Sequence, residues 1–396
     1  MTDTEALWWG TTATSLQAEG VAPMADWSRW ERTKRVPASG DGNGLATNHA
    51  DDFGLLASLG LTHTKLTLEW ARLEPEPGKI DTDAFDHYDE LFTSAERAGL
   101  SVIATLQSGT LPGWYSEDTP GHRDERGREY LWARQVDRCA ERWGDRVAIW
   151  VPIDDPVGWA IRGHLLGSRP PGRRDAETCA LAVEGALLAN YEAHRLLASG
   201  DAPVMAVFGT PTIFGHGPEP DAKRRWWHEM LFGTWMSALR DGELVIPGMA
   251  ARERPEMAGT FDLIGLAHDH PVAVDRTGAL HPYPADGRRS DTGFTPVVDE
   301  LGELISYVAS ELPGRELVIA GHGVATTDDE WREQIVTDTV ELLVDAVDHG
   351  VPVVGYLHDT GIDGYEGPKG FTTHRGLIAR DRTPKPSAEW LRDRLA

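Results

Sequence analysis

Short apolar, β-branched runs alternate along this chain with longer amphipathic segments, and this alternation constrains the fold more than any other feature. Eight runs of four to seven residues predict strands. They lie at residues 7–11, 62–68, 101–106, 147–153, 203–208, 261–267, 317–320 and 353–357. Because these runs are apolar almost throughout, they indicate a parallel sheet covered on its outer face, rather than an antiparallel sheet with one face in water.

Eight amphipathic segments separate and follow these runs. The predicted helices span residues 48–59, 81–99, 130–143, 175–197, 221–239, 296–310, 331–349 and 387–395. Asp81 and Asp83 suit the start of the second helix and Gly99 its end. Eight strand–helix units favour an α/β fold, a single (β/α)8 TIM barrel in which residues 1–396 form one domain. An open doubly wound sheet is less favoured, since no glycine-rich phosphate loop follows the first strand.

Charge and cysteine content exclude several classes of partner. The chain has 38 Lys and Arg against 63 Asp and Glu, a net charge of −25, whereas proteins that bind nucleic acids or anionic membranes need clustered basic residues. Cys139 and Cys179 lie in no metal-binding or redox spacing and are interpreted as reduced core thiols. Residues 1–10 lack the basic and apolar regions of a signal peptide, so a cytoplasmic location is expected.

The residues at the predicted strand ends are rich in carboxylates and imidazoles. In a barrel these ends meet on one face and build the active site. The positions are Gln17, Lys65, Ser108, Asp154, Asp155, His268, Asp269, His270, His322, His358, Asp359 and Glu366. Such groups are costly to bury without partners, so their convergence predicts a site for a small molecule. The segments 37–44 and 282–291 are interpreted as long barrel loops.

Collinear motifs cover nearly the whole chain. Residues 7–20, LWWGTTATSLQAEG, are similar to a pattern L-W-G-x-A-T-x-x-x-Q-x-E-G, and residues 68–75 to S-W-x-R-I-x-P. Residues 150–172, 355–377 and 383–385 match further segments of the same pattern in order. On these residues the chain resembles the β-glucosidase-like enzymes of glycoside hydrolase family 1.

The resemblance implies a retaining glycosidase with two glutamates, but neither glutamate is present. Residues 152–156 read PIDDP where the family has T-x-N-E-P, which puts Asp155 at the acid/base position and Asp154 at that of the asparagine. Residues 319–323 read IAGHG where the family has I-T-E-N-G, which puts Gly321 at the nucleophile position. A retaining mechanism needs both carboxylates.

Other positions that the resemblance assigns to the sugar site also differ. Lys65 stands for an arginine, Ser108 for a histidine, and Asp359 for a tryptophan. Residues 267–269, Ala-His-Asp, replace N-Y-Y, and glycine occupies two aromatic positions, 109 and 367. Gln17 and Glu366 alone remain from the family's set for the bound sugar. Taken together, these changes favour a site whose ligand or reaction differs from that of the resembled family.

Three functions remain open. The first is a barrel recruited for other acid/base chemistry on a small polar or glycosylated molecule, for example in natural-product biosynthesis, and the second is a non-catalytic protein that binds a sugar-like ligand. The third is a residual O-glycoside hydrolase with Asp155 as acid and water as nucleophile. The candidate catalytic residues are Asp155, Asp154, His322, Asp359 and His268. The candidate substrate-binding residues are Gln17, Lys65, Ser108, His270, Glu366 and Trp159.

Several finer expectations follow for this site. No cofactor or metal is expected, since strand alternation directs His268 and His270 into the pocket and Asp269 away from it. Lys65 is expected to compensate the adjacent carboxylates at positions 154 and 155. Trp114 and Trp159 are expected at the mouth, whereas most other tryptophans are expected in the core.

Overall fold

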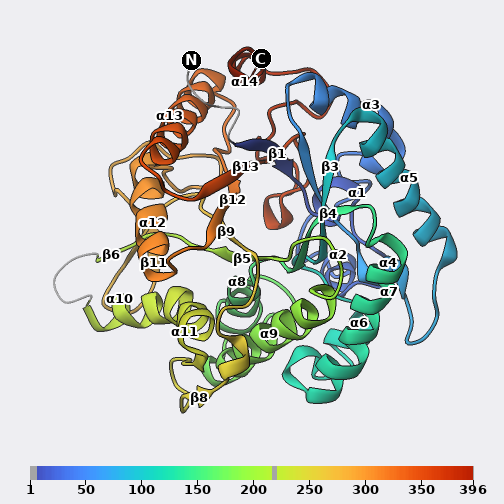
Figure 1. Cartoon of the computed structure of the whole chain (residues 1–396), viewed down its shortest axis with the longest axis vertical. Helices are drawn as coiled ribbons and strands as arrows, with labels where there is room; N and C mark the ends of the chain where they lie inside the picture. The colour runs from blue at the N-terminus through green and yellow to red at the C-terminus, as the bar shows by residue number, and fades with distance from the viewer. Residues whose placement is uncertain (1–6, 216–220, 396) are drawn as a thin grey trace.

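Eight parallel strands form the central barrel in a computed structural model that describes residues 7–215 and 221–395. They are β1 (Trp8–Thr12), β2 (His63–Thr67), β3 (Ser101–Gln107), β4 (Val147–Ile153), β5 (Met205–Gly209), β9 (Leu263–Ala267), β12 (Glu316–His322) and β13 (Val353–Asp359). Their order is β4-β3-β2-β1-β13-β12-β9-β5. Parallel bridges from Trp150 to Val204 and from Asp154 to Val207 join the two edges. The predicted (β/α)8 barrel is confirmed (Figure 1).

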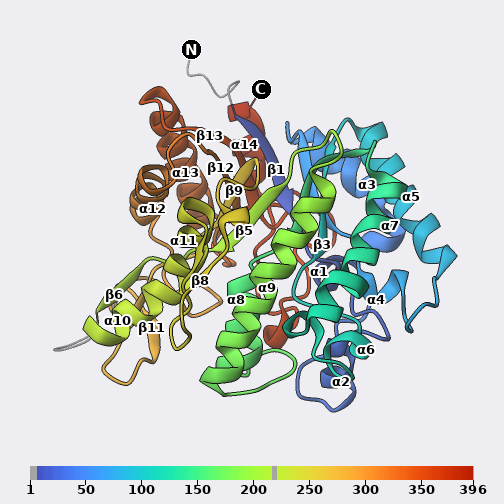
Figure 2. The ribbon, with the colours of Figure 1, turned by 60° about the horizontal axis from the view of Figure 1, so that its bottom comes forward.

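Long helices surround the strands (Figures 1 and 2). They are α3 (Leu45–Ser58), α5 (Thr82–Ala98), α7 (Ala133–Trp143), α9 (Ala176–Leu197), α10 (Asp221–His228), α11 (Thr234–Asp241), α12 (Val298–Glu311), α13 (Asp329–Asp348) and α14 (Pro386–Leu395). Asp81 caps α5 by accepting from the backbone N–H of Ala84, and Gly99 ends it in a left-handed conformation. The predicted start and end of this helix are thus confirmed.

Short helical segments that the sequence did not predict fill the loops. The α-helical ones are α1 (Ser15–Glu19), α2 (Asp26–Arg32), α4 (Trp70–Leu73), α6 (Gly113–Ser116) and α8 (Pro156–Ala160). The 3-10 segments are η2 (Gly121–Arg123), η6 (Pro255–Met257) and η7 (Gly367–Lys369), and the π-helical ones are η3 (Gly127–Trp132), η4 (Ile161–Leu165) and η5 (Glu229–Gly233). The single helix expected over 221–239 therefore contains a π-helical segment between α10 and α11.

Two small sheets lie outside the barrel. Strands β6 (Ile213–Gly215), β10 (Val272–Val274) and β11 (Leu280–Pro282) form one, and β7 (Glu243–Leu244) pairs with β8 (Arg252–Glu253) in the other. The loop expected over 282–291 thus begins inside a strand. Strands of two or three residues are too short to show an alternating pattern, which is why the sequence did not reveal them.

The core has an inner and an outer layer. Inside the barrel, apolar side chains pack together, among them Ile103, Val207, Leu263 and Ala320. A larger cluster lies between strands and helices and includes most of the tryptophans that were expected in the core. Cys139 and Cys179 are buried and unpaired there.

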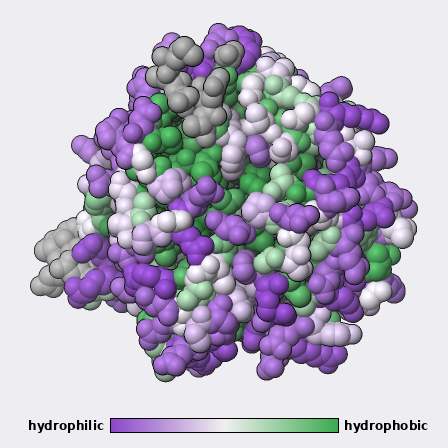
Figure 3. All heavy atoms as spheres, in the orientation of Figure 1, coloured by the Kyte–Doolittle hydropathy of each residue, from purple (hydrophilic) through white to green (hydrophobic). Residues whose placement is uncertain are grey.

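Hydrophilic side chains cover much of the periphery of the face in Figure 3, while hydrophobic ones gather nearer its centre. Within residues 7–215 and 221–395, no helix has both the length and the apolar character needed to cross a bilayer.

Candidate functional site

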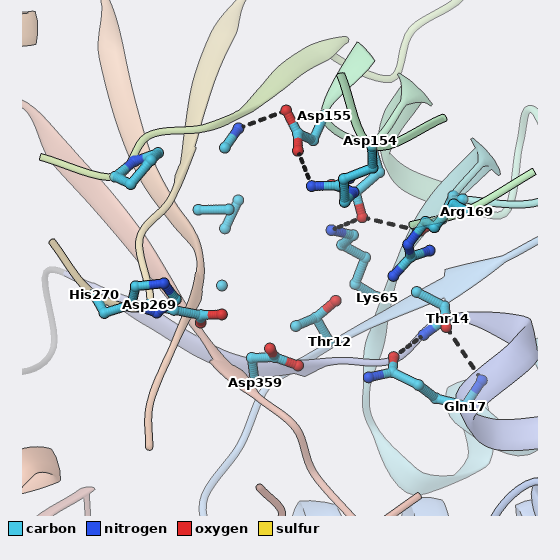
Figure 4. A pocket seen from close by; sticks show the side chains of 18 residues that line it. Thr12, Thr14, Gln17, Lys65, Asp154, Asp155, Arg169, Asp269, His270 and Asp359 are labelled. Carbon is cyan, nitrogen blue, oxygen red and sulfur yellow. Dashed lines mark hydrogen bonds and ion pairs between the residues drawn. The ribbon is translucent and has the colours of Figure 1, made fainter. Parts of the chain in front are cut away.

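A cavity of about 370 Å³ opens among the carboxyl ends of the barrel strands (Figure 4). Its walls come from β1, β2, β5, β9, β12 and β13 and from the segments that follow β1, β3, β4, β5 and β9. The lining residues are Thr12, Thr14, Gln17, Lys65, Ser108, Gly109, Asp154, Asp155, Arg162, Arg169, Gly209, Pro211, Ala267, Asp269, His270, Ala320, Gly321 and Asp359. The volume suits a small molecule.

Asp154 and Lys65 form a nearly buried ion pair on one side of this cavity. Lys65 Nζ lies 2.8 Å from Asp154 Oδ2, and the same oxygen accepts a hydrogen bond from Ser108 Oγ at 3.2 Å. The Lys65 side chain is only 3% exposed, so the carboxylate compensates a charge that burial would otherwise make costly. Lys65 was expected to compensate both Asp154 and Asp155, but it pairs with Asp154, while Asp155 pairs with Arg162.

Asp155 is held by a different set of donors. It is the N-cap of α8, and its Oδ1 accepts from the backbone N–H groups of Gly158 and Gly209, each at 2.9 Å. Its Oδ2 accepts from Arg162 Nη1 at 3.0 Å. Three donors thus fix this carboxylate as an acceptor, although one edge still reaches the cavity.

A buried guanidinium that the sequence analysis missed organises the opposite wall. Arg375 donates to Asp269 at 3.2 and 3.0 Å and to Asp359 at 2.9 Å, and its Nε lies 3.5 Å from Glu366. Because three carboxylates share one cation, one positive charge cannot offset all three negative charges. Arg375 lies within the matched segment 355–377, but nothing in the residue pattern linked it to Asp269 or Asp359.

This sharing separates the acidities of the three carboxyl groups. Burial raises the pKa of Asp359 to about 6, and that of Glu366 to about 7, with the Arg375 charge opposing the rise in both. For Asp269, burial acts in the same direction but the Arg375 charge and hydrogen bonds prevail, so its pKa falls below the ordinary value. Asp359, which lines the cavity, and Glu366, which was expected to bind substrate but does not line it, can therefore each exchange a proton near neutral pH.

Gln17 and Glu366 are bonded to each other beside the cavity. Gln17 Nε2 donates to Glu366 Oε1 at 2.8 Å. Gln17 is fixed from its other end by a capping box at α1, in which it exchanges hydrogen bonds with Thr14. The amide is thus oriented before any ligand enters.

Gly321 lines the cavity, and the space in front of it is open. A Cβ built on Gly321 would meet its nearest neighbours, Ala267 Cβ, Thr12 Cγ2 and Asp359 Cβ, at 3.7 to 4.0 Å, which are ordinary contact distances. At this position the cavity is therefore lined by backbone atoms alone.

The histidines do not lie as expected. His268 and His322 are fully buried, and neither lines the cavity; their rings lie against each other with centroids 6.0 Å apart. His270 and Asp269 line it instead, with His270 stacked on Phe294. The expected arrangement, with His268 in the pocket and Asp269 turned away, is therefore wrong.

The strand register explains this error. Along β9, Leu263 and Ala267 pack in the inner layer, so the alternating pattern continues inward to Asp269 and outward to His268. Along β12, Ala320 points inward, but the register is irregular between Ile319 and Gly321, so Gly321 also lines the wall and His322 is turned away. Burial lowers the pKa of both His268 and His322, which favours neutral rings.

Trp159 and Trp114 are not at the cavity either. Trp159 packs edge-on against the rings of His122 and His164 and lines a separate small pocket. Trp114 donates through Nε1 to the backbone oxygen of Glu74. Both follow strands, but short helices carry them away from the barrel axis, so their expected place at the mouth is wrong.

Two further arginines at the cavity were missed, Arg162 and Arg169, both in the loop region after β4. Their positions after the end of a barrel strand were the only sequence feature that could have indicated that they lie at the cavity. In the part of the chain that the structure describes, no three His, Cys, Asp or Glu side chains gather in a way that could hold a metal ion.

Comparisons with known proteins agree with this architecture. The model of the glycosyl hydrolase family 1 matches residues 4–214. Beta-glucosidase A of Thermotoga maritima is 23% identical, over 98% of this chain and 96% of its own length. Thermostable beta-glucosidase B of Thermobispora bispora is 25% identical, over 97% and 89%.

Solved structures show the same fold. The beta-glycosidase from Pyrococcus horikoshii superposes with a TM-score of 0.91 at 23% identity, over 100% of this chain and 95% of its own. A family 1 b-glucosidase from Thermotoga maritima gives 0.89 at 20% identity, over 99% and 98%. Since the family model spans more than half of the sequence, this chain belongs to glycosyl hydrolase family 1.

Proposed function

We propose that this family 1 barrel has a remodelled catalytic pocket and acts on a small polar or glycosylated molecule by acid/base chemistry, not by retaining double displacement. The observation that carries the proposal is the pairing of a bare wall at Gly321 with carboxyl groups whose pKa lies near neutrality. A retaining enzyme needs a carboxylate that attacks the anomeric carbon. Gly321, the residue at the position that the resemblance gives to that group, has no side chain.

Asp359 is the preferred proton donor or acceptor in this proposal. It lines the cavity, and its pKa of about 6 suits proton transfer near neutral pH. Asp154 holds Lys65 in place and offers its remaining oxygen to the ligand, while Gln17 and His270 supply further polar contacts. His268 and His322 are removed from the proposed machinery, since neither lines the cavity.

Asp155 is a weaker candidate for the general acid than its position in the motif suggests. Both of its oxygens already accept hydrogen bonds, two from backbone N–H groups and one from Arg162. A residual hydrolase with Asp155 as acid therefore gains little support. A protein that only binds a sugar-like ligand is supported by one observation, the preset pair of Gln17 and Glu366.

Turnover of a panel of nitrophenyl β-glycosides, combined with intact-mass measurement after incubation with a 2-deoxy-2-fluoroglucoside, tests the proposal. We expect the wild type to gain no covalent sugar mass, and Asp359→Asn to abolish any turnover that the wild type shows. Asp393→Asn, at an exposed position far along the chain in α14, is the matched control and should behave as the wild type.

Three outcomes separate the alternatives. A covalent sugar adduct on the wild type would contradict the proposal, because it requires an enzyme nucleophile. Turnover lost in Asp155→Asn but kept in Asp359→Asn would favour the residual hydrolase instead. Thermal stabilisation by sugars without any turnover would favour the binding protein. Gly321→Glu serves as the positive control for adduct formation, since ordinary contact distances surround its Cβ.

A further inference from the structure

One guanidinium at the cavity has no carboxylate partner. Lys65 and Arg162, the other cations that line it, each have a carboxylate oxygen within 3.0 Å. For Arg169 no ion pair or side-chain hydrogen bond is found within residues 7–215 and 221–395. Figure 4 shows its guanidinium directed into the cavity on the side of Lys65, opposite Asp269.

The surroundings of Arg169 are built to hold it there. Gly109 has a φ of +83°, and a Cβ on it would lie 2.6 Å from Arg169 Nη1, so a side chain at this position would strain the backbone and push the end of Arg169 from its present place. The Trp27 ring lies on another side, 5.8 Å from the guanidinium carbon. The glycine at position 109, an aromatic position in the resembled family, thus makes room for a charged side chain.

A second arginine is held beside it by the backbone. The N–H groups of Ser168 and Arg169 both donate to the carbonyl oxygen of Arg162, at 2.9 and 3.3 Å. Arg162 uses Nη1 for Asp155, but its Nε is buried without a hydrogen-bond partner. Among the described residues, Arg169 therefore offers the cavity a guanidinium with no carboxylate at ion-pair distance, and Arg162 adds a second positive charge beside it.

Electrostatics at this corner favour an added negative charge. Burial, together with the like charge of Arg162, lowers the pKa of Arg169 to about 10. The charges of Glu366, Asp155 and Asp26 act in the opposite direction without pairing with it. An anion between the two guanidinium groups would reduce both unfavourable effects, and arginine matches planar carboxylate and phosphate oxygens well.

We infer that the cavity takes a ligand with an anionic group, a carboxylate or a phosphate, which Arg169 and Arg162 bind while the polar remainder faces Gln17 and Asp359. That this ligand is a substrate rests on the proposed function. That it carries a negative charge does not. It narrows the substrate class from polar small molecules to sugar acids, sugar phosphates and compounds of similar charge.

Calorimetric titration with glucuronate, glucose 6-phosphate, inorganic phosphate and glucose tests the inference. We expect the wild type to bind one of the charged sugars at least about 10-fold more tightly than glucose, and Arg169→Gln to lose that advantage while its binding of glucose stays unchanged. Arg174→Gln, an exposed arginine of the same loop, is the matched control and should bind as the wild type does. The two charged sugars separate a carboxylate site from a phosphate site.

The inference is wrong if glucose and both charged sugars bind equally to the wild type, if no charged probe binds at millimolar concentration, or if Arg169→Gln binds the charged sugar normally. Arg169→Lys, which keeps the charge but not the planar donor pair, should bind it with intermediate affinity, and this variant decides the matter if Arg169→Gln folds poorly. Binding is measured without turnover, so the two proposals can fail separately. If the wild type binds the charged sugar, Arg169→Gln does not, and the wild type turns over no substrate, the inference is supported and the proposed function is contradicted.

Discussion

At the scale of single residues, Arg375 determines the chemistry of one cavity wall. Its guanidinium is nearly buried and faces Asp269, Asp359 and Glu366 at once. Removing the cation would leave three buried carboxyl groups without compensation, whereas removing one carboxyl group would leave the other two better matched to it. The wall is therefore set to hold a proton on Asp359 or Glu366 near neutral pH.

Glu366→Gln is expected to flatten the pH dependence of stability. Burial raises the pKa of Glu366 from its ordinary 4.5 to about 7, so between these values the folded state binds more protons than the unfolded state. The free energy of unfolding therefore falls as pH rises through this window, on the order of 2 kcal/mol for this group. Glutamine has no proton to lose, so urea unfolding at pH 4.5 and pH 7 should differ less in the variant.

Neighbouring groups do not hide this effect. Asp359 contributes with the same sign between pH 3.8 and about 6, and its share should shrink in the variant, because Arg375 then faces one carboxyl group fewer. This change adds to the flattening and does not oppose it. Asp269, whose pKa is lowered, contributes with the opposite sign and only below pH 4. Exposed Glu125→Gln is the control and should follow the wild type. Parallel stability curves for Glu366→Gln and the wild type would show that Glu366 does not titrate in this window.

The sequence indicated which strand ends would carry the site, but not which side chains would enter it. Gln17, Lys65, Ser108, Asp154, Asp155, His270 and Asp359 line the cavity as their positions suggested. His268 and His322 do not line it. Which side chains of a strand point inward depends on its pairing with neighbouring strands, and β12 has an irregular register just before His322. Arg375 and Arg169 lie in loops, where no periodicity predicts the direction of a side chain.

At the scale of elements, the junction between β4 and α8 combines a helix cap with the cavity wall. Asp155 sits at a φ of +55°, a conformation that Asp and Asn tolerate better than other residues with a side chain. Its Oδ1 joins the first turn of α8 to the end of β5 through Gly158 and Gly209. The residue thus has a structural role that is independent of any catalytic one.

Asp155→Asn is expected to fold nearly as well as the wild type, while Asp155→Ala is not. Asparagine keeps an acceptor for both backbone N–H groups and tolerates the positive φ, so its cost should stay within about 1 kcal/mol. Alanine loses the cap and strains the backbone, for a combined cost of roughly 2–3 kcal/mol. Urea unfolding of both variants measures the difference.

A second cap provides the comparison for this prediction. Asp175 caps α9 at an ordinary φ of −142° and is exposed, so Asp175→Ala should cost only about 1 kcal/mol. If Asp155→Ala were no more costly than Asp175→Ala, the backbone of Asp155 would not be strained, and if Asp155→Asn were as costly as alanine, the cap would not be its main role.

Long elements were predictable because their periodicity persists for many residues. Every barrel strand and the surrounding helices appear within a few residues of the expected bounds, as α9 at Ala176–Leu197 shows. The elements that the sequence missed are the short ones, such as α8 and β10, which are stabilised by contacts with the barrel and not by their own pattern. These short elements direct Trp159 away from the cavity, so missing them led to the wrong position for that residue.

At the scale of the whole molecule, the two halves of the chain share one barrel and one core. The family model matches residues 4–214, yet the structural similarity to the Pyrococcus horikoshii beta-glycosidase covers the complete chain. Strand β13, near the C-terminus, pairs directly with β1 and β12. The second half therefore keeps the fold outside the residues that the family model matches, and this half supplies Gly321, Asp359 and Arg375.

We predict that residues 1–396 unfold as one domain. One apolar cluster extends from Leu7 to Leu391, and β4 meets β5 to join the two ends of the sheet. Opening one half would expose the apolar face of the other, so neither half has a complete core of its own. Scanning calorimetry should therefore give a single transition whose calorimetric and van't Hoff enthalpies agree. Two resolved transitions, or a stable proteolytic fragment ending near residue 215, would show two separate folding units.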